Sequence, residues 1–332
     1  MNLFAGTAEA ARRRFRARLI RWYRRHRRGL PWRNTRDPYR IWVSEIMLQQ
    51  TRVAAVLSHY KDFLRRFPKV RKLAAARESS VLAAWSGLGY YARARSLHAA
   101  AKEIVRERRG RFPRSAEELG ALPGIGRYTA AAIASIAFGR PEAVVDGNVA
   151  RVLRRLSGAP ASERELWSQA QSLLSRHSPG DFNQAMMELG ATVCLPGAPR
   201  CDRCPVFAWC RTRGAAPGRV ALPRSKKKQV RFSLAARKDS VLLTRRAPGA
   251  SLMPRMWELP QTPSRNGASG RKPAVLFRLR HSITDTDYRV TVLRGAARAS
   301  QANGSWVRLS RLPRLPLTGL ARKILRRSNL LV

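Results

Sequence analysis

The sequence contains few acidic residues, no long apolar run and little cysteine. Asp and Glu number 20 in 332 residues, whereas Lys and Arg number 66, so the formal charge is +46. The most apolar stretch, residues 129–138, is too short to cross a bilayer. No apolar signal region precedes the arginines that begin at Arg12, so we expect an intracellular, cytoplasmic protein without a membrane partner. Four cysteines are too few for a disulfide scaffold in a chain of this size.

The excess of positive charge predicts a polyanionic partner. A chain this basic repels itself unless anions are close by, and nucleic acid is the leading candidate because each neutralised phosphate releases counterions. Arginine outnumbers lysine by 56 to 10, and a GC-rich genome is the alternative explanation for part of that excess. Apolar residues make up 44% of the chain, which is globular and long enough for two domains.

Residues 1–222 have the pattern of a helical domain. Apolar residues recur at helical spacing over 41–67, 80–85 and 92–105. Ser115 and Glu118 form a capping box that opens a short helix, Pro123-Gly-Ile-Gly126 breaks it, and a helix of small residues resumes over 127–138. No useful length alternates with a period of two, so we predict an all-α domain with a helical hairpin at 119–138.

The character of the chain changes after residue 222. Residues 223–230 are a proline-containing and lysine-rich stretch, which predicts a basic linker. Short β-leaning runs follow at 232–234, 240–244, 274–279 and 288–293, and a last helix is expected at 320–327. We therefore predict a smaller α+β domain over 231–332.

All four cysteines lie close together, which indicates a cofactor site. They are Cys194, Cys201, Cys204 and Cys210, in the spacing C-x6-C-x2-C-x5-C. A structural zinc usually takes two short cysteine pairs that are well separated, whereas here one pair is flanked by single cysteines. The spacing therefore favours an iron–sulfur cluster over zinc, which remains the alternative.

The hairpin contains two glycines, Gly124 and Gly126, directly before its second helix. Exposed backbone N–H groups at a helix N-terminus can bind a phosphate without reading sequence. In a chain of this charge the pattern favours a DNA contact, and an ordinary helix–turn–helix corner is the alternative.

Two acidic residues lie where they could perform chemistry. On a helix, Glu45 has apolar neighbours at Trp42 and Leu48, and its desolvation should raise its pKa, as a general acid requires. Asp146 lies between an apolar run and a helix, so it fits an N-cap that keeps it ionised. A neutral acid beside an anionic one is the arrangement of retaining glycosidases. The alternatives are a buried ion pair for Glu45 and a cap alone for Asp146.

Seven ordered motifs resemble those of the MutY-type adenine DNA glycosylases, which are helix–hairpin–helix base-excision enzymes. They are Leu30-Pro-Trp-Arg33, Ser44-Glu-Ile-Met-Leu-Gln-Gln-Thr51, Gly87-Leu-Gly-Tyr-Tyr-Ala-Arg93, the hairpin at 122–129, Val145-Asp-Gly-Asn-Val149, Phe182-Asn-Gln-Ala-Met-Met-Glu-Leu-Gly190 and the four-cysteine loop. The resemblance is dense over 20–215 and thinner beyond, where Met256-Trp-Glu-Leu-Pro260 is similar to a Nudix-like C-terminal domain. It implies a [4Fe–4S] cluster in the loop 194–210 and an 8-oxoguanine recognition domain over 231–332.

The resemblance implies a monofunctional glycosylase that flips adenine, mispaired with 8-oxoguanine or guanine, out of duplex DNA. Glu45 would protonate adenine N7, Asp146 would stabilise the oxocarbenium ion, and Tyr128 would help to position the intermediate. The resemblance assigns substrate and DNA contacts to Arg33, Gln50, Leu88, Tyr90, Gly124, Gly126, Asn148 and Glu188. For Glu188, a buried structural ion pair is the alternative. A bacterial monomer that associates with the nucleoid through DNA is expected.

The chain departs from this family where the C-terminal domain reads the oxidised base. The family's loop ends in Phe-Ser-His, and alignment on Arg280-His281-Ser282 places Ile283-Thr284-Asp285 there. Thr284 keeps a hydroxyl for the lesion, whereas Asp285 puts an anion beside DNA; pairing of Asp285 with Arg280 or Arg289 is the alternative. We predict a retained but reduced preference for A:8-oxoguanine over A:G, with Thr284 as the main contact.

Three other functions are weighed against this one. An endonuclease III-like glycosylase/lyase for oxidised pyrimidines needs an amine nucleophile, and position 128 holds Tyr rather than Lys. A Nudix hydrolase needs a run of glutamates to bind Mg²⁺, and Glu258 is the last glutamate of the chain. A non-catalytic mismatch binder would need neither Glu45 nor Asp146.

Overall fold

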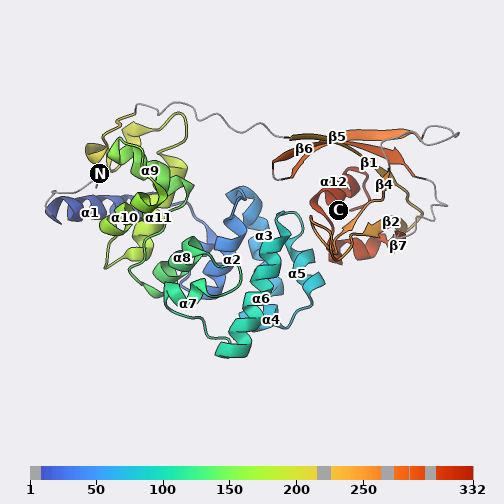
Figure 1. Cartoon of the computed structure of the whole chain (residues 1–332), viewed down its shortest axis with the longest axis horizontal. Helices are drawn as coiled ribbons and strands as arrows, with labels where there is room; N and C mark the ends of the chain where they lie inside the picture. The colour runs from blue at the N-terminus through green and yellow to red at the C-terminus, as the bar shows by residue number, and fades with distance from the viewer. Residues whose placement is uncertain (1–8, 215–225, 263–272, 284, 296–303, 332) are drawn as a thin grey trace. The chain divides into compact units, whose positions relative to one another are not determined.

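The computed structural model describes residues 9–214, 226–262, 273–283, 285–295 and 304–331 (Figure 1). These residues form two compact units. The first unit consists of residues 9–60, 69–74 and 99–214, and the second of 61–68, 75–98 and the described residues from 226 onward. The second unit therefore combines a helical segment from the first third of the chain with its C-terminal residues.

Helices make up the first unit, as the apolar spacing predicts, and two of them, α3 and α6, continue into the second unit. Their bounds are α1 (Glu9–His26), α2 (Pro38–Leu48), α3 (Val53–Arg66), α4 (Val70–Ala74), α6 (Tyr91–Arg108), α7 (Ala116–Gly120), α8 (Arg127–Phe138), α9 (Gly147–Ser157), α10 (Glu163–Leu173) and α11 (Pro179–Thr192), with short 3-10 turns η1 (Pro31–Arg33), η2 (Cys201–Arg203) and η3 (Phe207–Trp209). No helix in the described residues has the length and apolar content that a membrane span requires.

Local signals begin and end these helices. The Ser115 side chain accepts a hydrogen bond from the backbone N–H of Glu118, which is the capping interaction expected at the start of α7. Gly139 ends α8 in the left-handed conformation, at φ 65°, so the predicted helix 127–138 is confirmed. The helical spacing over 41–67 is interrupted, however, because Gln50 adopts φ 54° and separates α2 from α3.

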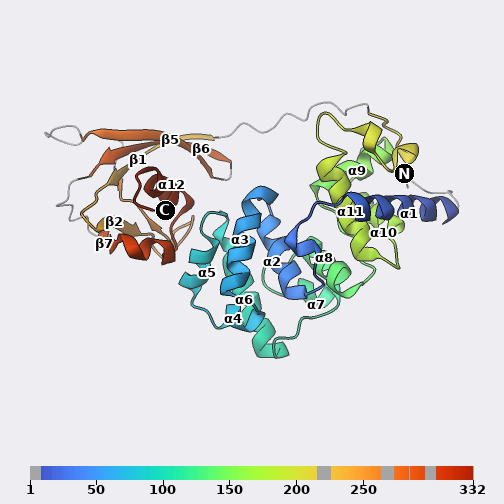
Figure 2. The same ribbon diagram turned by 180° about the vertical axis from the view of Figure 1, so that it is seen from behind.

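The core of one half of the first unit lies between α1, α9, α10 and α11, which Figures 1 and 2 show side by side. Phe15 and Leu19 of α1, Leu153 of α9 and Leu189 of α11 are buried together in this core. Full burial of each such side chain contributes roughly 1.5–3 kcal/mol. The packing holds the start of α9 against α11, and the candidate site lies at that junction.

The helical hairpin joins α7 to α8. Leu122 and Ile125 are buried and hold the turn on the helices, whereas Gly124 and Gly126 are exposed. Gly124 has φ 73°, in the left-handed region that glycine adopts without strain. Gly126 is the N-cap of α8, and a β-carbon there would meet nothing within 4 Å. The backbone N–H groups at the start of α8 are therefore accessible to an anion.

In the second unit, α5 (Glu78–Trp85) leads into the start of α6, and the described residues from 226 to 331 form what we call the C-terminal module. The module contains two sheets, in the strand orders β4-β1-β6-β5 and β3-β2-β7. Strand β1 runs parallel to β6, and β5 is antiparallel to β6. The elements are β1 (Lys226–Leu234), β2 (Ser240–Arg245), β3 (Trp257–Glu258), β4 (Gln261–Thr262), β5 (Val275–Ile283), β6 (Thr286–Arg294), β7 (Gly304–Arg308), η4 (Leu309–Arg314) and α12 (Gly319–Arg327).

The core of the module lies between the sheets and α12. Val230 of β1, Val292 of β6 and Ile324 of α12 are buried in it, as is Val241 of β2. The predicted change from a helical to a smaller, strand-rich domain is confirmed. The predicted basic linker is shorter than expected, because β1 begins at Lys226 and includes 226–230. These lysines remain exposed along the strand, so their charge gave no sign that their backbone pairs with β6.

Candidate active site

A cavity of about 540 Å³ opens in the first unit where η1, α2, α8, α9 and α11 meet. This volume suits a small molecule or a nucleobase. Its lining includes Arg28, Arg33, Glu45, Gln50, Tyr128, Asp146, Asn148, Gln184 and Met187. Six of these nine were expected to act in the reaction or to contact its substrate, although they come from distant parts of the chain. The fold therefore brings the three expected catalytic residues and three of the expected contact residues into one cavity.

Glu45 lies on the buried face of α2 and is 7% exposed. Burial raises the pKa of its carboxyl to about 7, although a hydrogen bond from Tyr128 lowers it; the charge of Asp146 raises it further, and that of Arg33 opposes the rise. The expected desolvation of Glu45 is confirmed. At neutral pH a large fraction of this residue carries a proton, as a general acid requires.

Tyr128 lies in the first turn of α8 and faces Glu45. Its hydroxyl donates a hydrogen bond to Glu45 Oε2 at 2.9 Å, and the same oxygen lies 3.2 Å from Met187 Sδ. Burial raises the pKa of Tyr128 well above its ordinary value, and the charge of Glu45 raises it further. Tyr128 therefore stays a hydroxyl and serves as a hydrogen-bond donor to the carboxyl group.

Asp146 is the N-cap of α9, as its position in the sequence indicates. Its Oδ1 accepts a hydrogen bond from the Val149 backbone N–H at 2.7 Å, and its Oδ2 accepts one from Asn148 Nδ2 at 3.0 Å. These two hydrogen bonds fix the orientation of the carboxyl group. Asp146 thus presents a fixed negative group to the cavity that Glu45 lines.

Behind Asp146 lies Arg151, a residue that the sequence analysis missed. Its Nη2 donates to Asn148 Oδ1 at 2.8 Å and to the Gly190 carbonyl at 2.7 Å, and its Nε donates to the Cys194 carbonyl at 2.8 Å. A β-carbon at Gly190 would lie 2.6 Å from the Asn148 β-carbon, so only glycine permits this approach of α11. Arg151 therefore connects the Asp146 cap with the first cysteine; its place one turn after Asn148 was the available signal.

Glu188 is fully buried beside the cavity and does not line it. Arg28 donates to both of its carboxylate oxygens, at 2.9 Å from Nε and 2.6 Å from Nη2, and Arg33 Nη2 donates to Oε2 at 2.6 Å. Burial alone would raise the pKa of Glu188, but the hydrogen bonds from the two arginines outweigh it and lower the pKa to about 2. Glu188 therefore holds Arg28 and Arg33 in place, which matches the structural alternative.

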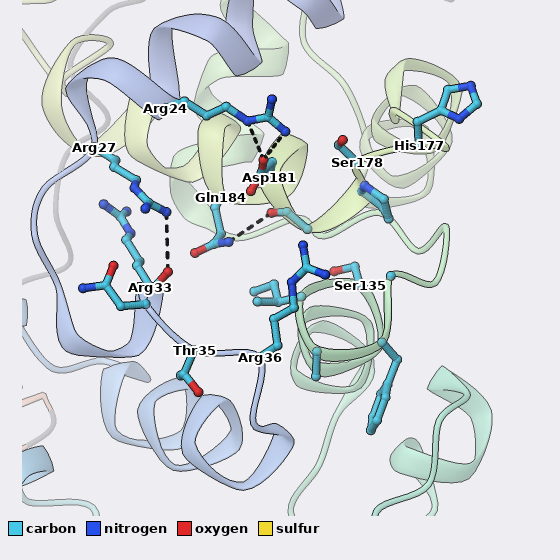
Figure 3. A pocket seen from close by; sticks show the side chains of 17 residues that line it. Arg24, Arg27, Arg33, Thr35, Arg36, Ser135, His177, Ser178, Asp181 and Gln184 are labelled. Atoms are coloured by element: carbon cyan, nitrogen blue, oxygen red, sulfur yellow. Dashed lines mark hydrogen bonds and ion pairs between the residues drawn. The ribbon is translucent and has the colours of Figure 1, made fainter.

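A second cavity of about 500 Å³ shares Arg33 and Gln184 with the first (Figure 3). Arg24 forms an ion pair with Asp181 at 2.7 Å on one side of it, and Arg36 projects from the other. Arg33 consequently lies between two cavities, with its guanidinium directed to Glu188. This basic cavity had no counterpart among the sequence predictions.

The residues expected to enter the base stack have unusual backbone geometry. Gln50 is exposed at the rim of the first cavity with φ 54°, and Tyr90, in the second unit, is 41% exposed with φ 47°. Positive φ is uncommon for residues other than glycine and concentrates at functional sites. Leu88 is only 6% exposed, so Tyr90 rather than Leu88 is the projecting side chain of its turn.

The four cysteines line one small cavity next to Arg155. Arg155 Nη1 lies 3.3 Å from Cys194 Sγ, its carbonyl accepts from Cys210 Sγ at 3.4 Å, and its buried Nε has no hydrogen-bond partner among the described residues. Burial, and then the neighbouring thiols, raise the pKa of Cys204 to about 11. The thiols thus converge beside a cation, and this donor set fits a cysteine-bound cluster.

Zinc, the alternative to a cluster, would place its own demand on the loop. Zinc holds its thiolates at about 2.3 Å, so four sulfurs around it must be very close together. In the described part of the chain, no three or more His, Cys, Asp or Glu side chains are arranged to hold one metal ion. Metal analysis of the purified protein distinguishes zinc from a cluster in this loop.

The β5–β6 hairpin contains the segment expected to read the lesion. Thr284 lies outside the described residues, whereas Ile283 and Thr286 pair across the hairpin. The structure pairs Asp285 with Lys226, at 3.3 Å, where the sequence analysis named Arg280 or Arg289. The reason is the register: Lys226 pairs with Thr286 beside the tip, whereas the two arginines face each other further along the strands.

Comparison with known proteins places this fold in one class. The model of the HhH-GPD superfamily of base excision DNA repair proteins matches residues 43–176. A thermostable thymine-DNA glycosylase of known structure is 30% identical, with a TM-score of 0.58 over 62% of this chain and 97% of that one. An endonuclease III–DNA covalent intermediate has the same fold, with a TM-score of 0.53 at 23% identity over 61% of this chain and 96% of that one. The chain belongs to the HhH-GPD superfamily.

Its curated relatives include adenine DNA glycosylases from distant organisms. The chain is 48% identical to the human enzyme over 227 residues, which are 64% of this chain and 41% of the relative. It is 40% identical over 199 residues to that of Buchnera aphidicola subsp. Baizongia pistaciae, covering 58% of this chain and 57% of the relative. The chain thus spans about half the length of the curated relatives it matches.

Proposed function

We propose that the chain is an adenine DNA glycosylase of base excision repair, which hydrolyses the N-glycosidic bond of adenine mispaired with 8-oxoguanine or guanine in duplex DNA. The observation that carries this proposal is the pairing of Glu45, which is protonatable at neutral pH, with the fixed carboxylate of Asp146 in one cavity of nucleobase size. The 38–48% identity to adenine DNA glycosylases supports adenine as the base.

The two carboxyl groups have different tasks in this reaction. The flipped adenine enters the cavity, and the Glu45 carboxylic acid donates its proton to adenine N7. The bond between N9 and the sugar C1′ then breaks, and its electron pair leaves with the base. The Asp146 carboxylate stabilises the resulting oxocarbenium ion or bonds to it transiently, while Tyr128 fixes the acid. Water adds to C1′ and returns a proton to Glu45, which leaves an abasic site.

The remaining expected contacts hold the duplex. The N–H groups at Gly124 and Gly126 bind a phosphate at the start of α8, without reading sequence. Gln50 and Tyr90 fill or wedge the base stack once adenine leaves it, and Arg33, held by Glu188, faces the base in the cavity. Asn148 contacts DNA near the Asp146 cap. The protein acts as a monomer.

A [4Fe–4S] cluster bound by Cys194, Cys201, Cys204 and Cys210 is part of the proposal. When bound, the cluster supplies a rigid centre that orders the basic loop at 194–210 for DNA binding, rather than redox chemistry in base removal. Arg155 beside Cys194 offsets part of the negative charge of the thiolates. Arg155 therefore provides a positive charge next to the site where an anionic group would bind.

The C-terminal module is proposed as a Nudix-like recognition domain for the base opposite adenine. Arg246 Nη1 donates to both carboxylate oxygens of Glu258, the last glutamate of the chain, at 2.9 and 2.8 Å, so Glu258 is engaged in an ion pair rather than free for Mg²⁺. Pyrophosphate hydrolysis is therefore not proposed. The hairpin between β5 and β6 is the element that would meet 8-oxoguanine.

The test is base removal from matched duplexes that contain A:8-oxoguanine, A:G, A:T or T:G, under single-turnover conditions. The T:G duplex is included because the thymine-DNA glycosylase is 30% identical. We expect excision from A:8-oxoguanine and A:G only, and its loss in Glu45→Gln with mismatch binding retained. Excision of thymine without adenine, or near-normal turnover by Glu45→Gln, would overturn the proposal.

A further inference from the structure

The turn between α5 and α6 presents one side chain outward and buries both of its ends. Tyr90 is 41% exposed at φ 47°, and Gly87 and Gly89 next to it also have positive φ, 112° and 72°. Ser86 and Tyr91, which flank the turn, are 4% and 3% exposed. A tyrosine persists in the left-handed conformation only when its surroundings hold it there. Within its own segment, the turn is held by Trp85 Nε1, which donates to the Gly89 carbonyl at 3.1 Å, and by Arg93 over the Tyr90 ring. Its two ends are held from elsewhere, and they also bear on where Tyr90 points.

Both ends are attached to one carbonyl group of the C-terminal module, within the second unit. Ser86 Oγ donates a hydrogen bond to the Leu317 carbonyl at 2.8 Å, and the Tyr91 hydroxyl donates to the same oxygen at 3.0 Å. Arg322 Nε on α12 donates to Ser86 Oγ at 3.0 Å. A carbonyl oxygen has two lone pairs, so it can accept both bonds. We call Ser86, Tyr91, Leu317 and Arg322 the turn clamp.

The clamp is fixed within the module. Thr318 N–H donates to the Trp257 carbonyl at 2.9 Å, and Trp257 N–H donates to the Pro316 carbonyl at 2.9 Å, so residues 316–318 pair with β3. The Thr318 hydroxyl then caps α12 by accepting from the Ala321 N–H. Leu317 consequently cannot shift without β3 and the start of α12.

The same start of α12 contacts β5 near the hairpin. A β-carbon at Gly319, two residues after Leu317, would lie 3.9 Å from the His281 ring, and Lys323 Nζ donates to the Arg280 carbonyl at 2.8 Å. His281 is two residues before Ile283, where β5 ends at the tip. A continuous set of contacts therefore leads from the hairpin through α12 to the turn clamp.

We propose that the turn clamp makes the base-stack wedge at Tyr90 responsive to the base that the β5–β6 hairpin contacts, and that Ser86, Tyr91 and Arg322 are positioning residues for lesion specificity. This inference rests on the proposed function. A hairpin seated on 8-oxoguanine biases the start of α12, and the clamp conveys that bias to the turn. Guanine opposite adenine makes fewer contacts with the hairpin, so insertion of Tyr90 into the base stack is stabilised less.

The variants remove clamp bonds while keeping the packing. Tyr91→Phe and Ser86→Ala each remove a hydroxyl, singly and together. The matched control is Arg95→Gln, because Arg95 Nη2 donates to the Pro254 carbonyl at 2.6 Å and so joins the same two segments away from the turn. Arg322→Lys retains the positive charge and is a milder disruption of the clamp. Thermal melting of every variant reports whether the variant is folded.

The main measurement is the ratio of single-turnover rates on A:8-oxoguanine and A:G. We expect the ratio to fall about tenfold in the double variant, the change that follows when about one hydrogen bond of coupling is lost. The A:G rate should stay within about twofold, and Arg95→Gln should keep the wild-type ratio. A folded double variant with an unchanged ratio, or an equal fall in Arg95→Gln, overturns the proposal.

A second measurement does not depend on base removal. In a Glu45→Gln background, 2-aminopurine next to the target adenine reports opening of the base stack by fluorescence. Opening should be greater opposite 8-oxoguanine than opposite guanine, and Ser86→Ala with Tyr91→Phe should abolish that difference. Addition of Ile283→Ala to the clamp variants should cause no further loss, whereas additive losses contradict the coupling. If the Glu45→Gln protein with an intact clamp responds in this way but the wild type removes no adenine, the proposed function fails and the clamp stands.

Discussion

Removal of the Tyr128 hydroxyl should move the pH dependence of base removal to higher pH. The hydroxyl donates to Glu45 Oε2 at 2.9 Å, and this hydrogen bond lowers the pKa of Glu45 against the effect of burial. Tyr128→Phe keeps the ring in its place and deletes only the donor. The carboxylate then loses more stabilisation than the neutral acid does, so the pKa of Glu45 should rise.

The magnitude follows from the strength of the bond. A hydrogen bond to a charged group contributes about 1.5–3 kcal/mol, and a shift of one pKa unit corresponds to about 1.4 kcal/mol. The neutral acid retains part of this interaction with the hydroxyl, so the difference between the two forms is about half of it. We therefore expect the pKa of Glu45 to rise by about one unit, from about 7 in the wild type.

The assay is single-turnover excision of adenine from an A:8-oxoguanine duplex as a function of pH. A general acid works in its protonated form, so the rate is constant at low pH and falls as pH rises through the pKa of Glu45. In Tyr128→Phe this fall should occur about one pH unit higher, whatever happens to the plateau rate.

The opposite shift is the control. Asp146→Asn removes a negative charge that raises the pKa of Glu45, so the fall in its residual rate should occur at lower pH. Excision in Asp146→Asn should also be severely slowed, because a neutral amide cannot offset the developing cation. A midpoint that stays at the wild-type pH in both variants would show that Glu45 is not the titrating acid.

Four further predictions address other parts of the molecule. Glu188→Gln should lower the free energy of unfolding by about 3–5 kcal/mol in urea titrations, because buried Arg33 and partly exposed Arg28 lose their carboxylate partner. In the wild type, the stabilisation that ionised Glu188 provides should be lost as pH falls from the ordinary carboxyl range toward its lowered pKa of about 2. A free energy of unfolding that does not change over this pH range would contradict this. Because Tyr128 cannot form an imine, strand scission should need alkali or heat, and a strong borohydride-trapped adduct would refute monofunctional action. Metal analysis should find about four irons per chain in brown protein, whereas stoichiometric zinc in colourless protein excludes the cluster. Asp285→His should raise the A:8-oxoguanine to A:G rate ratio by removing an anion beside DNA; an unchanged ratio means that this residue does not affect discrimination.

Features that depend on neighbours in the sequence could be predicted. The helix at 127–138 lies between two glycines, and the cap at Asp146 is set by residues up to three positions away. The burial of Glu45 followed from apolar side chains one turn away on the same helix. These interactions are local, so the sequence pattern carries them directly.

Features that join distant segments could not be predicted. The hydrogen bond from Tyr128 to Glu45 spans 83 positions, and that from Ser86 to Leu317 spans 231. Such contacts depend on how helices and sheets pack, for which spacing along the chain gives no measure. The strand at 226–230 was also missed, since its pairing with β6 comes from backbone groups while its lysines are exposed.

The geometry at Asp146 explains why a cap and a catalytic group need not be alternatives. A carboxylate has about four lone-pair sites, and the contacts found here use two: Val149 N–H takes one on Oδ1, and Asn148 Nδ2 takes one on Oδ2. The two bonds hold the plane of the group, while its remaining sites stay available on the side of the cavity. Arg151 fixes Asn148 in turn, so the cap is itself supported from α11. The helix start therefore supplies both the orientation and the charge that an oxocarbenium ion requires, and one residue can serve both purposes.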